Sequence, residues 1–351
     1  MSTAVIDNKG VQRANSKAKK GKTPKRSDNQ TQQKLTNLQQ AIANKIIGQH
    51  SLIENLLVCL LADGHMLIEG MPGLAKTTAA KALAKGVEGE FHRVQFTPDL
   101  LPSDIIGTEI YLQETGNFTF RKGPLFNNIL LADEINRAPA KVQSALLEAM
   151  GERQVTVGLK SYQLPELYMV LATQNPIEQE GTYNLPEAQL DRFLMHVVID
   201  YPTHDEELKI IELDENRLSH QDSNNKNRKI DITSQQEIFN ARKELLEIHI
   251  SEPLKNYIIS LVSASRFPEK YDAELTKLIT HGASPRATLA IVRCAKALAW
   301  LREDEYVTPH HIQTIAPNIL SHRIMPSFEA EAKAISRQEI VAKLLEVVAV
   351  P

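Results

Sequence analysis

The chain has 351 residues, of which 42% are hydrophobic and 24% are charged, and its formal net charge is −3. This composition excludes a disordered or fibrous chain, and the length predicts two domains of about 100–200 residues each. No apolar run approaches the roughly 20 residues of a membrane span, and no apolar segment follows the N-terminal charges, so we expect neither a membrane span nor a secretory signal. Cys59 and Cys294 lie in apolar, helix-prone surroundings and predict reduced core thiols in a cytoplasmic protein.

Residues 1–30 form a basic leader. They contain eight basic and two acidic side chains, a net charge of +6, which leaves −9 on the rest of a chain whose net charge is −3. Their Ser, Asn, Lys and Gly content predicts disorder. A basic segment can contact nucleic acid or an anionic membrane, but this one has no aromatic side chain for base stacking. We therefore favour a solvated leader without such a contact.

Residues 31–63 are expected to form two helices, because apolar residues recur at helical spacing before Gly48 and again over 52–61. Ser51 could cap the second helix. The turn at 46–49 either places backbone against a nucleotide base or is a plain connection between helices. The residues leave both interpretations open.

The stretch 66–85 has the pattern of a phosphate-binding loop: an apolar run over 66–68, an interruption by glycine and proline, and then an Ala/Leu/Lys-rich helix. Glycines let backbone N–H groups surround phosphate oxygens, and the helix N-terminus adds its positive end. Lys76 would contact the β- and γ-phosphates, and the Thr77 hydroxyl would bind magnesium. The expected cofactor-binding residues are Gly70, Met71, Pro72, Gly73, Leu74, Ala75, Lys76, Thr77 and Thr78.

One position departs from the general motif, which has glycine directly before the lysine where this chain has Ala75. Alanine is acceptable there if the residue already has helical backbone angles. Gly73 lies deeper in the loop, where we expect a bulkier residue to cost more.

Between this loop and the next set of functional residues, 91–96 alternates in the manner of a strand. The β-prone runs 109–112 and 118–121 flank a Thr-Gly-Asn turn and predict a hairpin. A second hairpin is expected over 154–157 and 162–164, around Gly158.

Asp133 and Glu134 directly follow the apolar run 129–132. A buried strand that ends in two carboxylates is the usual partner of a phosphate-binding loop in ATPases, with Asp133 orienting the magnesium ligands and Glu134 activating water as general base. The alternative is that both carboxylates only cap the following helix, expected near 139–150.

Two more polar residues occupy positions where ATPases place functional groups. Asn175 follows the expected buried strand 167–171 and could hydrogen-bond the γ-phosphate or the water, although a residue before proline is also a common turn former. Arg192 ends a short helix, 186–193, that leads into the expected strand 194–199. It is either a surface cation or an arginine finger that reaches the γ-phosphate of a neighbouring subunit.

The C-terminal part reads as all-helical after a polar, mobile loop at 220–229. The expected helices lie near 233–249, 252–265, 285–301, 308–316 and 335–348. Ser284 as cap and Pro285 at the first helical position predict a helix start. Arg286 then lies in the first turn, where the helix dipole disfavours a cation, which suggests a compensating anion such as an ATP phosphate. A solvated arginine is the alternative.

Together these segments resemble the AAA+ ATPases, most closely the MoxR family in their helix-2-insert branch. The resemblance covers about residues 35–350 and is carried by the segments 70–77, 95–104, 133–138, 172–183, 185–193 and 282–287. It implies an α/β fold: a P-loop AAA+ core with a parallel sheet and two inserted β-hairpins, followed by a smaller all-helical lid domain. The matching boundaries are 1–30 for the leader, 31–202 for the nucleotide-binding domain, 203–229 for a linker and 230–351 for the lid.

The resemblance also implies the site. ATP and Mg²⁺ are the cofactors, Thr77 and Asp133 hold the metal, and Glu134 activates water. Asn175 becomes sensor 1, Arg192 the finger that acts in trans and Arg286 sensor 2 on the lid. The implied activity is ATP hydrolysis in a ring, commonly a hexamer, with chaperone-like remodelling or maturation of protein complexes that contain a von Willebrand factor A domain. Ala75 is similar to the family's own form of the loop.

Three other functions remain as alternatives: a nucleic-acid motor, a chelatase-like subunit that drives metal insertion, and a nucleotide-gated scaffold without turnover. The acidic body of the chain and the absence of a zinc-ligand pattern argue against the nucleic-acid motor. Glu134 argues against the scaffold, which would have no use for a general base.

Overall fold

The computed structural model describes residues 29–114, 116–176, 181–219 and 231–351. The leader expected over 1–30 lies outside the described residues except for Asn29 and Gln30, which begin helix α1 (Asn29–Ala43). The loop expected over 220–229 lies outside them as well.

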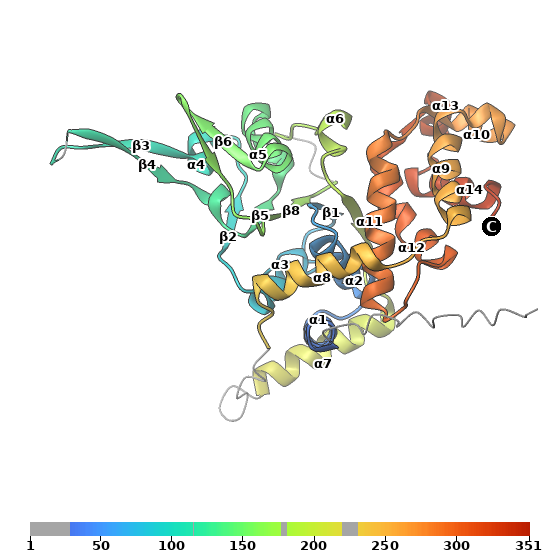
Figure 1. Ribbon diagram of the computed structural model, residues 1–351, viewed down its shortest axis with the longest axis horizontal. Coiled ribbons are helices and arrows are strands. Elements are labelled where there is room, and N and C mark those ends of the chain that lie inside the picture. Colours follow the sequence, from blue (N-terminus) through green and yellow to red (C-terminus); the bar gives the residue numbers. More distant parts are fainter. Residues whose placement is uncertain (1–28, 115, 177–180, 220–230) are drawn as a thin grey trace, which may run out of the picture.

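A five-stranded parallel sheet in the order β2-β5-β8-β1-β9 forms the centre of the α/β part (Figure 1). Its strands are β1 (Met66–Gly70), β2 (Phe91–Gln95), β5 (Ile129–Asp133), β8 (Met169–Gln174) and β9 (Met195–Ile199). In the central strand, Met66 pairs with Leu171 on one side and with Met195 on the other. All four pairings are parallel, so the carboxyl ends of the strands meet at one edge of the sheet.

Successive side chains of each strand point to opposite faces of the sheet and enter two different cores. One core joins Met66 and Ile68 to α1, α2 (His50–Leu61) and α3 (Lys76–Gly86), and it continues into the C-terminal helices. The other core joins Leu67 and Leu130 to α4 (Pro102–Ile106) and α5 (Ala140–Glu152). Because both faces are covered, the central strands are apolar runs rather than alternating ones.

Two antiparallel hairpins extend from the α/β part, as expected, and the longer one projects far from the body (Figure 1). They are formed by β3 (Gly107–Leu112) with β4 (Asn117–Lys122), and by β6 (Gln154–Val157) with β7 (Lys160–Gln163). The rings of Phe120 and Tyr162 stack with centroids 4.4 Å apart and join the two hairpins. Tyr111 and Phe118 are exposed on the longer hairpin, with ring centroids 5.2 Å apart.

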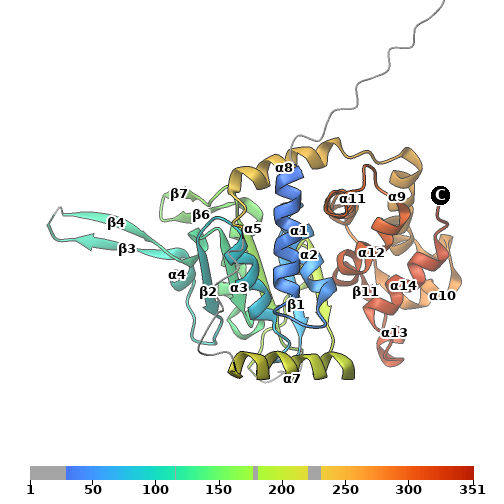
Figure 2. The ribbon, with the colours of Figure 1, turned by 90° about the horizontal axis from the view of Figure 1, so that it is seen from below.

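The C-terminal part is helical and contains all five helices expected from the sequence. Its longer helices are α8 (Gln235–Glu247), α9 (Glu252–Arg266), α11 (Pro285–Leu301), α12 (Pro309–Leu320) and α14 (Arg337–Val347). The shorter elements were not expected: α10 (Ala273–Leu278), α13 (Phe328–Ala332) and a small pair of strands, β10 (Ile279–His281) with β11 (Met325–Pro326). Figure 2 shows α8 passing from the α/β part to the other lid helices.

Two local expectations need correction. The segment 203–229, expected as a linker, contains helix α7 (His204–Ser219), which lies beneath the α/β part in Figure 1. Its apolar residues at 208, 210, 211 and 213 point to different sides of the helix, so the sequence shows no single apolar stripe by which a helix is recognised. Ser51 is not the cap of α2, which begins at His50; its hydroxyl instead accepts a hydrogen bond from Asn55 Nδ2 at 3.2 Å.

Polar contacts join the lid to the α/β part in addition to the shared core. Arg302, which follows α11, donates from Nε and Nη2 to the two carboxylate oxygens of Glu54 on α2, each at 2.9 Å. Lys34 Nζ lies 2.6 Å from Glu237 Oε1. Both cysteines are buried and free. No described helix combines the length and the apolar surface that crossing a bilayer requires.

The Arg302–Glu54 pair provides a stability prediction. Arg302→Lys keeps the charge but loses the two-pronged contact, and the pair is partly solvated, so we expect a loss below about 1 kcal/mol in the free energy of unfolding. Urea denaturation followed by circular dichroism measures it. A loss of several kcal/mol would mean that this pair, rather than the shared core, holds the lid in place.

Candidate active site

The loop between β1 and α3 brings the expected phosphate-binding residues to the carboxyl edge of the sheet. Lys76 is the first residue of α3, and its Nζ donates to the carbonyl oxygens of Gly70 and, at 3.2 Å, of Gln174. Gly73 has φ +86°, and a Cβ there would meet nothing within 4 Å. A side chain at this position would therefore cost backbone strain rather than a steric clash.

Ala75 does not meet the condition of right-handed helical angles under which alanine would be accepted without strain. It lies in the left-handed region with φ +59° and ψ 17°, where alanine costs about 1–2 kcal/mol. The chain needs this conformation to turn from the loop into α3. Contact of Ala75 with the hydrophobic core offsets part of the strain, which glycine could not do.

Asp133 is the last residue of β5 and is buried beside Lys76 and Thr77 at this edge. Its carboxylate accepts hydrogen bonds from the Thr77 hydroxyl at 3.2 Å and from Arg93 Nε at 2.9 Å. Thr173, on the neighbouring strand β8, also donates its hydroxyl to Asp133. Hydroxyl and carboxylate oxygens are the ligands that magnesium prefers, so Thr77 and Asp133 fit the ion expected from the sequence.

Glu134 follows the strand in a strained conformation, with φ +57° and ψ 52°. Non-glycine residues in this region cost about 1–3 kcal/mol and persist where the surroundings fix them. Here the Glu134 N–H donates to Thr173 Oγ1 at 2.9 Å, and the carboxylate accepts from Gln95 Nε2 at 2.7 Å and from Arg137 Nη1 at 2.9 Å. The carboxylate is thus held at the mouth of the same site and retains solvent access.

These residues line a cavity of about 330 Å³. Asn175 reaches it from the end of β8, which lies between β1 and β5. A second cavity of about 470 Å³ adjoins it through the loop residues Gly73, Leu74, Ala75 and Thr78. The turn at 46–49, for which the sequence left two interpretations open, lines this cavity together with Pro202 and helix α7. The geometry favours the base-binding interpretation of that turn.

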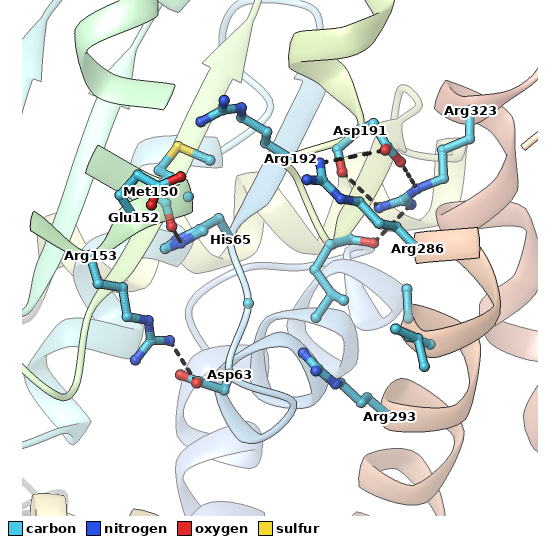
Figure 3. Close-up of a pocket in the computed structure, with 15 residues that line it drawn as sticks. Asp63, His65, Met150, Glu152, Arg153, Asp191, Arg192, Arg286, Arg293 and Arg323 are labelled. Carbon is cyan, nitrogen blue, oxygen red and sulfur yellow. Dashed lines mark hydrogen bonds and ion pairs between the residues drawn. The ribbon is translucent and has the colours of Figure 1, made fainter. Parts of the chain in front are cut away.

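Arg192 and Arg286 do not belong to this cavity. They line a separate cavity of about 430 Å³ together with Asp63, His65, Arg153, Asp191, Arg293 and Arg323 (Figure 3). His65 precedes β1, so this cavity lies at the amino edge of the sheet. The five residues of β1 separate the two edges by roughly 16 Å. Neither arginine lies near the phosphate-binding loop of its own chain.

The guanidinium of Arg192 rests on the last turn of α5. Its Nη1 donates to the carbonyl oxygen of Leu147 at 2.6 Å, and Figure 3 shows the side chain directed away from Asp191. Gly151 makes this approach possible, since a Cβ there would lie 2.7 Å from Nη1.

His65 contacts the same end of α5. Burial lowers the pKa of His65 to about 4, so the ring is neutral. The ring accepts a hydrogen bond from Val170 N–H at 3.0 Å and donates one to Met150 O at 3.3 Å.

Arg286 stands in the first turn of α11, where Ser284 caps the helix as expected. The anion beside it in this chain is Asp191, at 3.6 Å from Nη1. Ser284 donates its hydroxyl to the same carboxylate at 3.0 Å. The compensating anion expected from the sequence is therefore a protein carboxylate here, and Arg286 keeps 64% of its side chain exposed.

Sequence reasoning missed four residues that hydrogen-bond the carboxylates of Asp133 and Glu134: Arg93, Gln95, Arg137 and Thr173. Arg93 and Gln95 alternate on β2 and so share one face of that strand, but only the pairing of β2 with β5 brings them to the two carboxylates. Arg137, three residues after Glu134, is the one that local spacing could have indicated.

A model of the ATPase family associated with various cellular activities (AAA) matches residues 65–195, and an AAA lid domain matches residues 274–344. Chaperone MoxR1 of Mycobacterium tuberculosis is 43% identical over 307 residues, which cover 87% of this chain and 79% of that protein. The chain belongs to the MoxR family of AAA+ ATPases.

Other proteins similar to this MoxR-family chain agree with the assignment. Protein MoxR of Methylorubrum extorquens is 30% identical over 320 residues, or 88% of this chain and 91% of that protein. The crystal structure of a Cytophaga hutchinsonii protein described as an ATPase matches with a TM-score of 0.82 at 46% identity, covering 92% of this chain and 96% of that one. The P-loop core and helical lid expected from the sequence are thereby confirmed.

The left-handed Ala75 can be tested by stability. Ala75→Gly loses a methyl group but relieves the backbone strain. Ala82→Gly, in the middle of α3, loses a methyl group and helix propensity and relieves no strain. Ala75→Gly should therefore cost at least about 1 kcal/mol less than Ala82→Gly in the free energy of unfolding. Equal losses in urea denaturation would contradict the strain at Ala75.

Proposed function

We propose that this MoxR-family protein is a magnesium-dependent ATP hydrolase that drives chaperone-like remodelling or maturation of protein complexes. The observation that carries the proposal is the division of the charged groups between two edges of one sheet. The phosphate-binding loop, Asp133 and Glu134 lie at the carboxyl edge, and Arg192 with Arg286 lies at the amino edge. Each chain then supplies complementary parts of two different ATP sites.

At the carboxyl edge the residues have distinct roles. Lys76 would exchange its two carbonyl partners for the β- and γ-phosphates, and Asn175 would hydrogen-bond the γ-phosphate or the attacking water. Glu134 would take the proton of that water as general base. Magnesium, held through Thr77 and Asp133, would neutralise charge on the phosphates.

At the amino edge Arg192 and Arg286 would act in trans, on the γ-phosphate bound by the next subunit. A guanidinium delivered there stabilises charge that develops on the transferring phosphoryl group. Repeating this head-to-tail contact closes a ring, and a hexamer is the size that we propose.

Protein clients fit the exposed surface better than nucleic acid does. The longer hairpin presents Tyr111 and Phe118, and its two acidic residues, Glu109 and Glu114, balance the charge of its two basic residues at 121 and 122. Nucleic-acid binding would require a basic groove. We propose that the partner contains a von Willebrand factor A domain. We also propose that this protein is cytoplasmic, because its two free, buried cysteines fit a reducing compartment. Metal insertion through a partner is one form that the maturation could take.

Two substitutions separate binding from hydrolysis. Lys76→Ala should abolish nucleotide binding, because it removes the ammonium that would contact the β- and γ-phosphates. Glu134→Gln should bind ATP and fail to hydrolyse it, because the amide cannot accept the proton. Fluorescent-nucleotide titration and magnesium-dependent phosphate release measure the two effects, and normal turnover in Glu134→Gln would overturn its assignment as base.

The shared site is tested by Arg192→Ala. This variant should bind ATP nearly as the unaltered protein does and lose about 10³-fold or more in turnover, as arginine fingers do. Coexpression with Glu134→Gln subunits should restore activity, since an intact Glu134 then meets an intact Arg192 across some interfaces. Assembled mixed rings without recovered activity would contradict a site built from two subunits.

A further inference from the structure

Arg323, which follows α12 in the lid, is buried against the segment that carries Arg192. Only 3% of its side chain is exposed. Its Nε donates to Asp191 Oδ1 at 2.8 Å, Nη2 donates to Phe193 O at 2.6 Å, and Nη1 donates to Leu194 O at 3.2 Å. A fourth contact, Nη1 to Ile319 O at 2.6 Å, holds the guanidinium on its own helix.

These contacts involve the residues on both sides of Arg192 in the sequence. Asp191 precedes it and Phe193 and Leu194 follow it, and Nη2 also donates to the Asp191 carbonyl oxygen at 3.4 Å, so one planar guanidinium contacts the backbone on both sides of the proposed finger. The adjacent lid residue His322 adds a hydrogen bond between Nε2 and Phe193 O at 3.2 Å. Five donors in a rigid fork suit this arrangement, and a lysine ammonium could not reach the same set of acceptors.

The Asp191 carboxylate connects this contact to the second arginine. It accepts from Arg323 and from the Ser284 hydroxyl, and it lies 3.6 Å from Arg286. All three partners belong to the lid. The position of Arg286 and that of the Arg192 backbone therefore depend on the same carboxylate.

We propose that Arg323 is a positioning residue for the arginine finger, and that through it the lid of one subunit sets the place at which Arg192 meets the ATP of the next. The inference rests on the proposed trans role of Arg192 and extends it to a residue that contacts no nucleotide. A lid displacement changes the position of residues 191–194, because the contacts of Arg323 join them directly. The state of one subunit's lid thereby controls hydrolysis in its neighbour.

The primary test is Arg323→Lys, with Arg302→Lys as the matched control. Arg302 also joins the lid to the α/β part by a two-pronged arginine contact, but its partner Glu54 lies on α2, away from the finger segment. Arg323→Lys should lose about 10²-fold in kcat, the effect of a small misplacement of a reacting group, while its affinity for a fluorescent ATP analogue stays within about twofold of normal. Arg302→Lys should have the kcat and the nucleotide affinity of the unaltered protein.

Coexpression with Glu134→Gln distinguishes positioning from general damage. In random mixed rings about one quarter of the sites pair the intact Glu134 of an Arg323→Lys subunit with the undisturbed finger of a Glu134→Gln subunit. We expect about a quarter of normal turnover, compared with near zero for either variant alone. No recovery, in rings that assemble, would mean that Arg323 serves only its own subunit, and the proposal would be overturned.

Asp191→Asn is the second variant, in case Arg323→Lys does not fold. It removes the shared charge but leaves the contacts of Arg323 with the carbonyls of Phe193 and Leu194, so we expect a smaller loss of kcat that Glu134→Gln subunits also restore. Full turnover in a folded Arg323→Lys protein, with Arg192→Ala inactive, would refute the positioning role and leave the proposed function standing. Full turnover in Arg192→Ala would instead refute the shared site itself.

Discussion

The parallel pairing of five strands is the constraint on which the rest of this structure depends. Because all strands run in one direction, their carboxyl ends deliver Gly70, Asp133 and Gln174 to a single edge, and loops from that edge complete the phosphate site. The same constraint sends the segments that precede β1 and β9 to the opposite edge. Arg192 lies three residues before β9, so no adjustment of its side chain can bring it to its own chain's cavity. Under the proposed role of Arg192 in trans, the need for a second subunit follows from the direction of the strands.

Much of the fold and of the phosphate site could be predicted because their signals are local. Buried strands appear as apolar runs, Ser284 and Pro285 mark a helix start, and the loop before Lys76 has a recognisable order of residues. Asp133 and Glu134 could be predicted to lie beside the loop because they follow an apolar run, as the end of a buried strand does. Each of these inferences needs only a few neighbouring residues.

The rest depends on tertiary contacts that adjacent residues do not reveal. Arg93 and Gln95 reach Asp133 and Glu134 only because β2 lies beside β5, and Arg323 meets residues about 130 positions earlier in the chain. The left-handed angles of Ala75 arise from the turn between loop and helix, where packing overrides the preference of alanine. Helix α7 was missed because its apolar residues, at 208, 210, 211 and 213, do not recur at the spacing of one helical face.

The core that runs without a break from one face of the sheet through α1 and α2 into the lid helices has a consequence for cooperativity. A lid with its own core could detach and unfold alone, but here detachment would expose apolar surface on both sides at once. The two parts defined by chain order therefore form one thermodynamic unit. Local unfolding at low cost is left to elements outside that core, above all the β3–β4 hairpin that projects from the body (Figure 1).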